Sequence, residues 1–117
     1  MTSFALRSLL YVPGSNARAL EKAQGLAADM LIIDLEDAVP ADRKDDARAA
    51  MRAAVTAGFP GKQVAVRING TGSAQQAADI AALAGLTLDA IVLPKVDAPA
   101  DLDPVRAIGV PLFGVIE

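Results

Sequence analysis

Five short runs of apolar, β-forming residues recur along the chain, and alanine-rich segments separate them. The runs are predicted strands at 7–12, 30–35, 64–68, 90–94 and 111–116. Some of them, such as Leu31-Ile32-Ile33, are apolar at every position and not only at alternate ones. Such runs are typical of strands that are covered on both faces, as in parallel sheets.

The segments between the runs have the spacing of helices and are predicted within 16–27, 41–62, 73–85 and 98–109. Asn16 is a candidate N-cap, and Ala19, Leu20, Ala23 and Leu26 form an apolar stripe after it. We expect the second helix to end at Gly58 and the third to run from Ser73 to Gly85. The fourth is expected to be short, because Pro99 and Pro104 interrupt it.

Strands that alternate with helices predict right-handed βαβ units and a parallel sheet. Two α/β architectures satisfy this pattern, an open doubly wound sheet and part of a (βα)8 barrel. A complete barrel takes about 250 residues, so a chain of 117 residues supplies only four βα units and a fifth strand. The hydrophobic content of 53% is enough for one core, and we expect one domain.

Composition excludes several classes of function. The chain has no cysteine and no histidine, so it supplies no disulfide, no thiol nucleophile and no Ser-His-Asp site. A net charge of −3 with scattered basic residues argues against nucleic-acid binding. No run approaches the roughly 20 residues that cross a bilayer, and the N-terminus does not resemble a signal peptide. We therefore expect a soluble, cytoplasmic protein.

Polar residues gather at the carboxyl ends of the predicted strands, where parallel α/β folds place their sites. They are Ser15 and Asn16, then Asp34, Glu36 and Asp37, then Arg67 and Asn69, then Lys95, and finally Glu117. The strand interiors carry almost no charge. This asymmetry is the strongest functional signal that the residues themselves provide.

The three acids after the second run permit two interpretations. Acidic residues commonly end a strand and cap the next helix, but carboxylates this close together repel each other unless cations or backbone donors compensate. A divalent ion such as magnesium would relieve that repulsion. Alternation places Asp34 and Glu36 on one face and Asp37 on the other.

The basic residues also permit alternatives. Arg67 either pairs with a neighbouring carboxylate or clamps a substrate carboxylate with its planar fork. Asn69-Gly70 is interpreted as a pair of turn-forming residues. Lys95 either binds an anionic ligand or pairs with Asp97. Basic residues on the predicted helices are expected to lie on solvated faces; they are Arg18, Lys22, Arg43, Arg48 and Arg52.

Taken together, these motifs resemble the citrate lyase beta subunit family, within the wider HpcH/HpaI aldolase group of malyl-CoA and citramalyl-CoA lyases. The resemblance rests on LLYVPGSNARALEKA, ADMLIIDLEDAVP, Lys44 and Ala47-Arg48, VAVRING, AIVLPKV and the terminal GVIE. It implies a TIM barrel, of which residues 1–117 are the N-terminal half of a single domain. It also implies a magnesium-dependent carbon-carbon lyase that acts on a CoA- or carrier-linked thioester and a 2-oxo acid.

The resemblance implies a role for particular residues. Glu117 matches a glutamate that binds the metal, and Arg67 matches an arginine that binds the oxo acid. Glu36 and Asp37 match acids on the pocket floor. Ser15, Asn16 and Lys22 fall where the family's first loop and helix meet coenzyme A.

The same resemblance implies a second metal ligand, an aspartate, beyond Glu117, and an assembly of several copies. The 117 residues alone are therefore expected to be inactive. Replacing Arg67 or Glu117 by alanine in the complete protein is expected to abolish turnover with little loss of folding. Two other interpretations are a non-catalytic half-barrel that pairs with another chain and a receiver-like signalling domain, whose acid and lysine positions fit this chain poorly.

Overall fold

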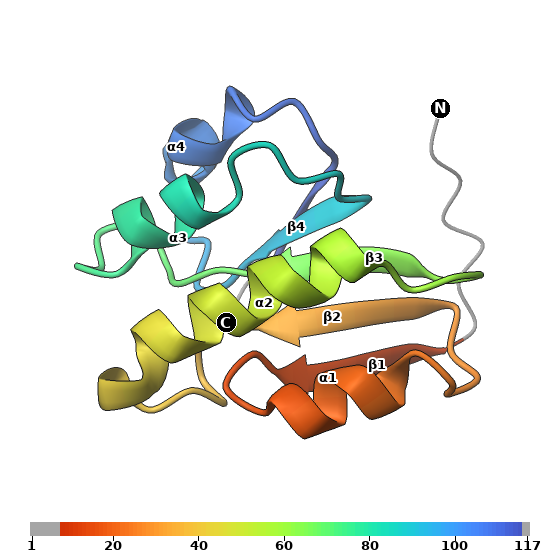
Figure 1. The fold of residues 1–117 in the computed structure, drawn as a ribbon. Coiled ribbons are helices and arrows are strands. Elements are labelled where there is room, and N and C mark those ends of the chain that lie inside the picture. Colours follow the sequence, from red (N-terminus) through yellow and green to blue (C-terminus); the bar gives the residue numbers. More distant parts are fainter. Residues whose placement is uncertain (1–7, 116–117) are drawn as a thin grey trace.

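A computed structural model describes residues 8–115 and contains one five-stranded parallel sheet within them (Figure 1). The strands are β1 (Leu9–Pro13), β2 (Met30–Asp34), β3 (Gln63–Arg67), β4 (Ala90–Leu93) and β5 (Leu112–Gly114). The first and last residue of each strand lie within two positions of the first and last residue of the predicted run. The apolar runs therefore form the strands that the sequence predicts.

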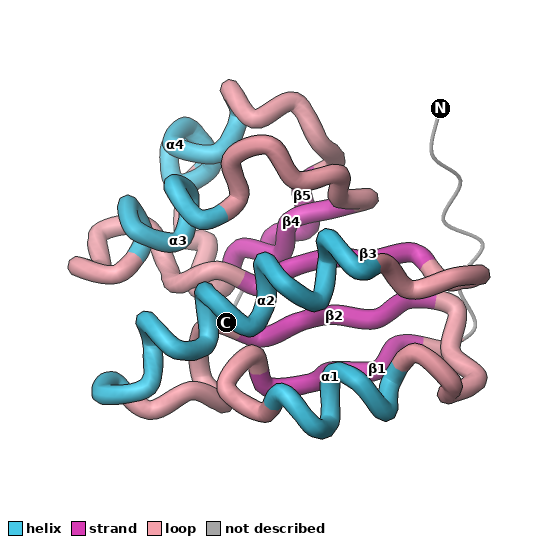
Figure 2. Tube along the Cα trace, in the orientation of Figure 1, coloured by secondary structure: helices cyan, strands magenta, loops and turns pink. Residues whose placement is uncertain are grey.

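A helical segment follows each of the first four strands. These segments are α1 (Ala17–Ala23), η1 (Ala41–Arg43) with α2 (Lys44–Ala57), α3 (Gln76–Ala82), and η2 (Pro99–Leu102) with α4 (Asp103–Arg106). Figures 1 and 2 show α1 and α2 lying across one side of the sheet, with α3 and α4 next to β4. The order of elements is βαβαβαβαβ, as predicted.

The strands lie side by side in sequence order, β1-β2-β3-β4-β5, and all neighbours are parallel. A doubly wound sheet reverses its strand order and carries helices on both faces. Sequential order instead means that the chain winds in one direction, as in a (βα)8 barrel. The strand order therefore agrees with the barrel that the family resemblance implies and excludes the doubly wound sheet that the strand pattern alone also permits. It also excludes the receiver-like fold, whose strand order is 2-1-3-4-5.

Alternate strand residues pack into two separate cores. Leu31, Ile33, Val66 and Ile91 point toward the helices and belong to the larger cluster, which also contains Met51 of α2. The opposite face holds a smaller cluster of strand residues, namely Met30, Ile32, Ala65, Ala90 and Val92, with Phe113 and Val115 against them. The helices thus cover one face, and the other face is the one that lines the interior of a barrel.

Helix ends differ from the prediction where loops take over the first and last turns. Asn16 caps α1 as predicted, since its Oδ1 accepts a hydrogen bond from Ala19 N at 2.9 Å. Helix α1 ends at Ala23, however, so Leu26 is exposed and does not extend the apolar stripe. Ser73 lies in a turn before α3, which begins only at Gln76.

Gly58 ends α2 with a φ of 90°, a conformation that glycine adopts without strain. The two prolines of the fourth helical segment each lie in the first turn of a short helix, η2 and α4, where proline is tolerated. Within residues 8–115, no helix combines the length and the apolar composition that crossing a bilayer requires.

Gly14 allows the β1–α1 loop to pass closely over the end of β2. Its N–H donates to Asp34 O at 2.8 Å, and a Cβ at this position would lie 3.0 Å from Leu35 Cδ2 and 3.2 Å from Ala47 O. We expect Gly14→Ala to lower the free energy of unfolding by about 1–3 kcal/mol, the usual cost of overpacking. Urea unfolding followed by circular dichroism measures this loss.

Gly25 provides the matched control, because a Cβ there would meet only Lys22 O at 3.9 Å. Gly25→Ala should change stability by less than about 0.5 kcal/mol. An equal loss in both variants would show that close packing at Gly14 is not the cause.

Candidate functional site

Two charged residues end neighbouring strands on the face that the helices leave uncovered. The β2–β3 register places Asp34 beside Arg67. Asp34 continues the alternation of Met30 and Ile32, and Arg67 continues that of Ala65, so both point away from the helices. This places them at the carboxyl edge of the sheet.

Arg67 and Asp34 form a bidentate ion pair. Arg67 Nε lies 2.9 Å from Asp34 Oδ1, and Nη2 lies 2.6 Å from Oδ2. The Asp34 side chain is almost wholly buried and also accepts hydrogen bonds from Glu36 N at 2.8 Å and Ala38 N at 3.0 Å. Four donors therefore hold this carboxylate.

These contacts set the pKa values of the pair. Burial by itself would raise the pKa of Asp34, but the hydrogen bonds from Arg67 and from the Glu36 and Ala38 amides outweigh it and hold the pKa below its ordinary value. The hydrogen bond to Asp34 raises the pKa of Arg67. Both groups are therefore charged at neutral pH.

Glu36 is the second acid of this cluster and lies between two cations. Its Oε1 is 3.7 Å from Arg67 Nε, and its Oε2 is 3.3 Å from Lys95 Nζ. The Lys95 side chain is 61% exposed, and its backbone has a φ of 56°. The ring centre of Tyr11, on β1, lies 5.0 Å from the Arg67 guanidinium carbon, within cation–π range. We call Tyr11, Asp34, Glu36, Arg67 and Lys95 the strand-end cluster.

The cluster shows which ion pairs Arg67 and Lys95 make, whereas their binding of an anionic ligand stays a prediction. Arg67 does pair with a neighbouring carboxylate, Asp34, through two of its three guanidinium nitrogens. Nη1 has no hydrogen-bond partner within residues 8–115. Lys95 pairs with Glu36 and not with Asp97.

Residues 7–109 match the family described as HpcH/HpaI aldolase/citrate lyase. The chain belongs to the HpcH/HpaI aldolase/citrate lyase family.

Within this family, the chain is 47% identical over 114 residues to a (3S)-malyl-CoA thioesterase of Cereibacter sphaeroides, covering 95% of this chain and 40% of the relative. It is 38% identical over 106 residues to an L-malyl-CoA/beta-methylmalyl-CoA lyase of the same species, covering 87% and 33% of the two chains. The chain thus spans less than half the length of these relatives.

A solved structure of the family has the same fold. The citrate lyase beta subunit of M. tuberculosis, complexed with oxaloacetate and magnesium, is 32% identical and superposes with a TM-score of 0.80. The superposition covers 97% of this chain and 48% of that one. The family and the fold that the sequence motifs predicted are both confirmed.

The structure brings together only some of the residues that the family resemblance singled out. Arg67 and Glu36 share the strand-end cluster. Asp37 is exposed and makes no hydrogen bond or ion pair with residues of the described range 8–115. Glu117, the predicted metal ligand, lies outside the described residues.

The predicted coenzyme A contacts lie on the β1–α1 loop and on α1. Asn16 is exposed, and its side-chain oxygen is engaged in capping α1. Lys22 is exposed on the last turn of α1, and Ser15 is partly buried. These three residues have no contact with the strand-end cluster among the hydrogen bonds and ion pairs of the described chain, so their role stays a prediction.

Two predictions about polar residues are wrong. Arg48 was expected on a solvated face, but it is buried and its Nε donates to Asp79 Oδ1 at 2.9 Å. Asn69 was interpreted as turn chemistry, but it is buried and bonded to Asp79 Oδ2 through both its backbone N and its Nδ2. Asp79 is fully buried, and its place four residues before Leu83, on the buried side of α3, is the sequence signal that could have identified it.

The acids of the strand-end cluster are engaged with cations and backbone donors and are not gathered into a cage for a metal ion. No group of three ligating side chains within residues 8–115 is placed to hold a metal ion. Arg67 and Lys95 compensate Glu36, and four donors surround Asp34, so the repulsion that suggested a cation is already relieved.

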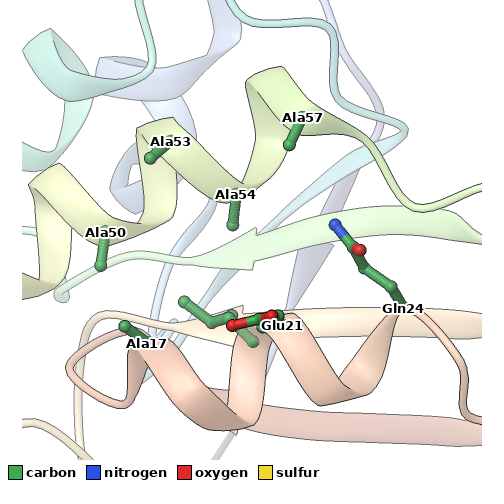
Figure 3. A pocket seen from close by; sticks show the side chains of 8 residues that line it. Ala17, Glu21, Gln24, Ala50, Ala53, Ala54 and Ala57 are labelled. Atoms are coloured by element: carbon green, nitrogen blue, oxygen red, sulfur yellow. The ribbon is translucent and has the colours of Figure 1, made fainter.

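A cavity of about 250 Å³ lies elsewhere, between α1 and α2 (Figure 3). Alanine side chains of α2 form one wall, and Glu21 of α1 and Gln24, directly after α1, lie opposite them. No residue of the strand-end cluster lines it. Its place on the helical layer separates it from the carboxyl edge of the sheet, where the charged residues gather.

Proposed function

We propose that residues 1–117 are the N-terminal half of a TIM-barrel lyase domain. The complete protein would break or form a carbon-carbon bond in a CoA- or carrier-linked hydroxy-acid thioester of the citryl, malyl or citramalyl type. Family membership supports this activity, as does a singly wound sheet whose charged residues gather at its carboxyl edge. The enzyme would be a homo-oligomer, as the resemblance implies, and cytoplasmic, as the sequence composition favours.

The observation that carries the proposal is the way in which Arg67 is held. Asp34 and the Tyr11 ring fix the guanidinium from two sides, and Nη1 has no partner within residues 8–115. A fixed guanidinium with a free nitrogen suits recognition of a carboxylate, because little side-chain entropy is then lost on binding. Arg67 would hold the oxo-acid carboxylate, and Glu36 and Asp37 would lie at the floor of the same pocket.

Magnesium is the cofactor of this proposal, as in the relative solved with oxaloacetate and magnesium. Glu117 would be one ligand, and the second carboxylate would come from outside this chain. A bound magnesium ion supplies Lewis-acid activation of a carbonyl. The described residues contribute the substrate-orienting cation, Arg67, and the carboxylate of Glu36.

A second candidate activity is thioester hydrolysis. The relative with 47% identity is a (3S)-malyl-CoA thioesterase, and it matches 95% of this chain. The two reactions give different products from the same malyl thioester. Carbon-carbon cleavage of malyl-CoA gives acetyl-CoA and glyoxylate, whereas hydrolysis gives malate and free coenzyme A.

The deciding experiment incubates the complete protein with (3S)-malyl-CoA, with magnesium or with excess EDTA. Phenylhydrazine traps glyoxylate, and a disulfide reagent detects the free thiol of coenzyme A. We expect magnesium-dependent glyoxylate without free thiol. Free thiol without glyoxylate would establish the hydrolase instead. If malyl-, citramalyl- and citryl-CoA all release neither a trapped oxo acid nor free thiol, the result would favour the non-catalytic half-barrel.

A further inference from the structure

A buried polar network lies behind the acidic loop, on the helix side of the sheet. It connects Lys44 and Arg48 of α2, Asn69 after β3, and Asp79 of α3. Arg48, Asn69 and Asp79 are less than 9% exposed. Burial of this many polar groups is costly unless each is bonded, and no buried side-chain nitrogen or oxygen of the described residues lacks a partner.

Lys44 connects this network to the loop that carries Glu36. Its ammonium donates to Leu35 O at 3.1 Å, to Glu36 O at 2.9 Å and to Asn69 Oδ1 at 3.0 Å. An ammonium has three donors, so all of them are engaged. Two consecutive carbonyl groups are thereby held toward α2.

Asn69 donates to the same Leu35 carbonyl as Lys44, and Asp79 holds Asn69 in place. Asn69 Nδ2 donates to Leu35 O at 3.1 Å and to Asp79 Oδ2 at 2.6 Å. Asp79 Oδ1 in turn accepts from Arg48 Nε at 2.9 Å. A chain of hydrogen bonds therefore runs from α3 through Asn69 to the backbone of residues 35 and 36.

The two sides of the loop are geometrically coupled. Fixing the Leu35 and Glu36 carbonyls toward α2 leaves the backbone N–H of Glu36 directed at Asp34 Oδ1 and the Glu36 side chain near Arg67 and Lys95. Rotation of these peptide units would move the Glu36 side chain away from Arg67 and would withdraw the Glu36 N–H from Asp34 Oδ1. The network makes no contact with Arg67 itself, so any effect on Arg67 passes through the loop.

We propose that Lys44, Asn69, Asp79 and Arg48 are positioning residues that fix Glu36 opposite Arg67 from behind the sheet. The inference rests on the proposed function insofar as Glu36 and Arg67 form the substrate site. Such a network acts on the site through backbone orientation and not through contact with the substrate. Its loss should therefore lower kcat more than it raises KM.

The test compares Lys44→Met with Arg52→Met in the complete protein. Both remove a basic side chain from α2, but Arg52 donates to the Ala82 and Ala84 carbonyls at the far end of α3 and not to the acidic loop. Two readouts are measured, the NMR signal of the Arg67 Nε–H and the kinetic constants. The signal is assigned to Arg67 by its absence from the spectrum of the Arg67→Lys variant.

In Lys44→Met we expect the Arg67 signal to shift and to exchange faster with water, with kcat lower by about 10- to 100-fold, the usual effect of removing an orienting partner. Arg52→Met should leave the signal and kcat unchanged. Lys44→Gln, which retains an amide donor, should have an intermediate effect and replaces Lys44→Met if that variant does not fold.

An unchanged Arg67 signal in a folded Lys44 variant would overturn the proposal, and so would equal shifts in the Lys44 and Arg52 variants. The NMR readout does not depend on any enzymatic activity. A protein without turnover on any of the thioesters, but with the expected shift, would therefore contradict the proposed function and still support the positioning role.

Discussion

Arg67→Ala should lower the free energy of unfolding by about 3–5 kcal/mol, because it leaves a buried carboxylate without its cation. Asp34 is only 1% exposed, and two of its four hydrogen bonds come from Arg67. The same substitution should reduce kcat by about 10²- to 10³-fold, as expected when a fixed donor to the reacting substrate is lost. Urea unfolding and the malyl-CoA assay of the complete protein measure the two effects.

Arg43 provides the control for removing an arginine from a surface pair. Arg43 pairs with Asp46, and both side chains are at least half exposed. Arg43→Ala should therefore cost less than about 1 kcal/mol and should not affect turnover. A stability loss in Arg67→Ala as small as that in Arg43→Ala would contradict a strong pair with Asp34.

The pair itself is isolated by a double-mutant cycle. Asp34→Asn combined with Arg67→Met should be much less destabilising than the sum of the single changes, because neither buried charge is then left alone.

The structure also alters the expectation drawn from the sequence, namely that Arg67→Ala would leave folding almost intact. That expectation did not include a buried partner.

Asp34→Asn should lower stability at pH 7, and the loss should shrink in acid. The pKa of Asp34 is lowered in the folded protein from its ordinary value of 3.8, so its ionised form stabilises the fold above that pH. As the pH falls from 3.8 through the folded pKa, the wild-type carboxyl becomes protonated and this contribution is lost. The stability difference between wild type and Asp34→Asn should therefore be constant near neutrality and shrink below pH 3.8.

Urea unfolding of both proteins at a series of pH values measures this difference. Asp101→Asn serves as the control, because Asp101 also accepts two backbone hydrogen bonds, from Asp97 N and Ala98 N, but lies at the surface. Its substitution should have a smaller effect. A difference between wild type and Asp34→Asn that grew on acidification would have the wrong sign for a carboxyl with a lowered pKa.

The strands and their order of appearance follow from local sequence. Runs such as 30–35 and 64–68 form β2 and β3 with their limits displaced by only one residue, because a continuous apolar run of this length favours a doubly covered strand. The carboxyl ends of parallel strands meet at one edge, so the gathering of Glu36 and Arg67 was also predictable. The motifs that resemble the family include these strand ends, and the family was confirmed by the match over residues 7–109.

The partners of the charged residues were decided by tertiary structure. Asp34 and Arg67 are 33 positions apart, and their pairing depends on the β2–β3 register, which no local pattern specifies. Arg48 resembled an ordinary helical surface residue until α3 placed Asp79 against it.

Sequence by itself therefore determined the parallel α/β pattern, the edge at which the polar residues gather and the family. The family in turn implied a barrel, which the strand order confirms. Tertiary structure decided which carboxylate holds Arg67 and that a buried network supports the acidic loop. The physical reason is range: secondary structure depends on neighbouring residues, whereas an ion pair or a buried network depends on how segments distant in the chain pack together.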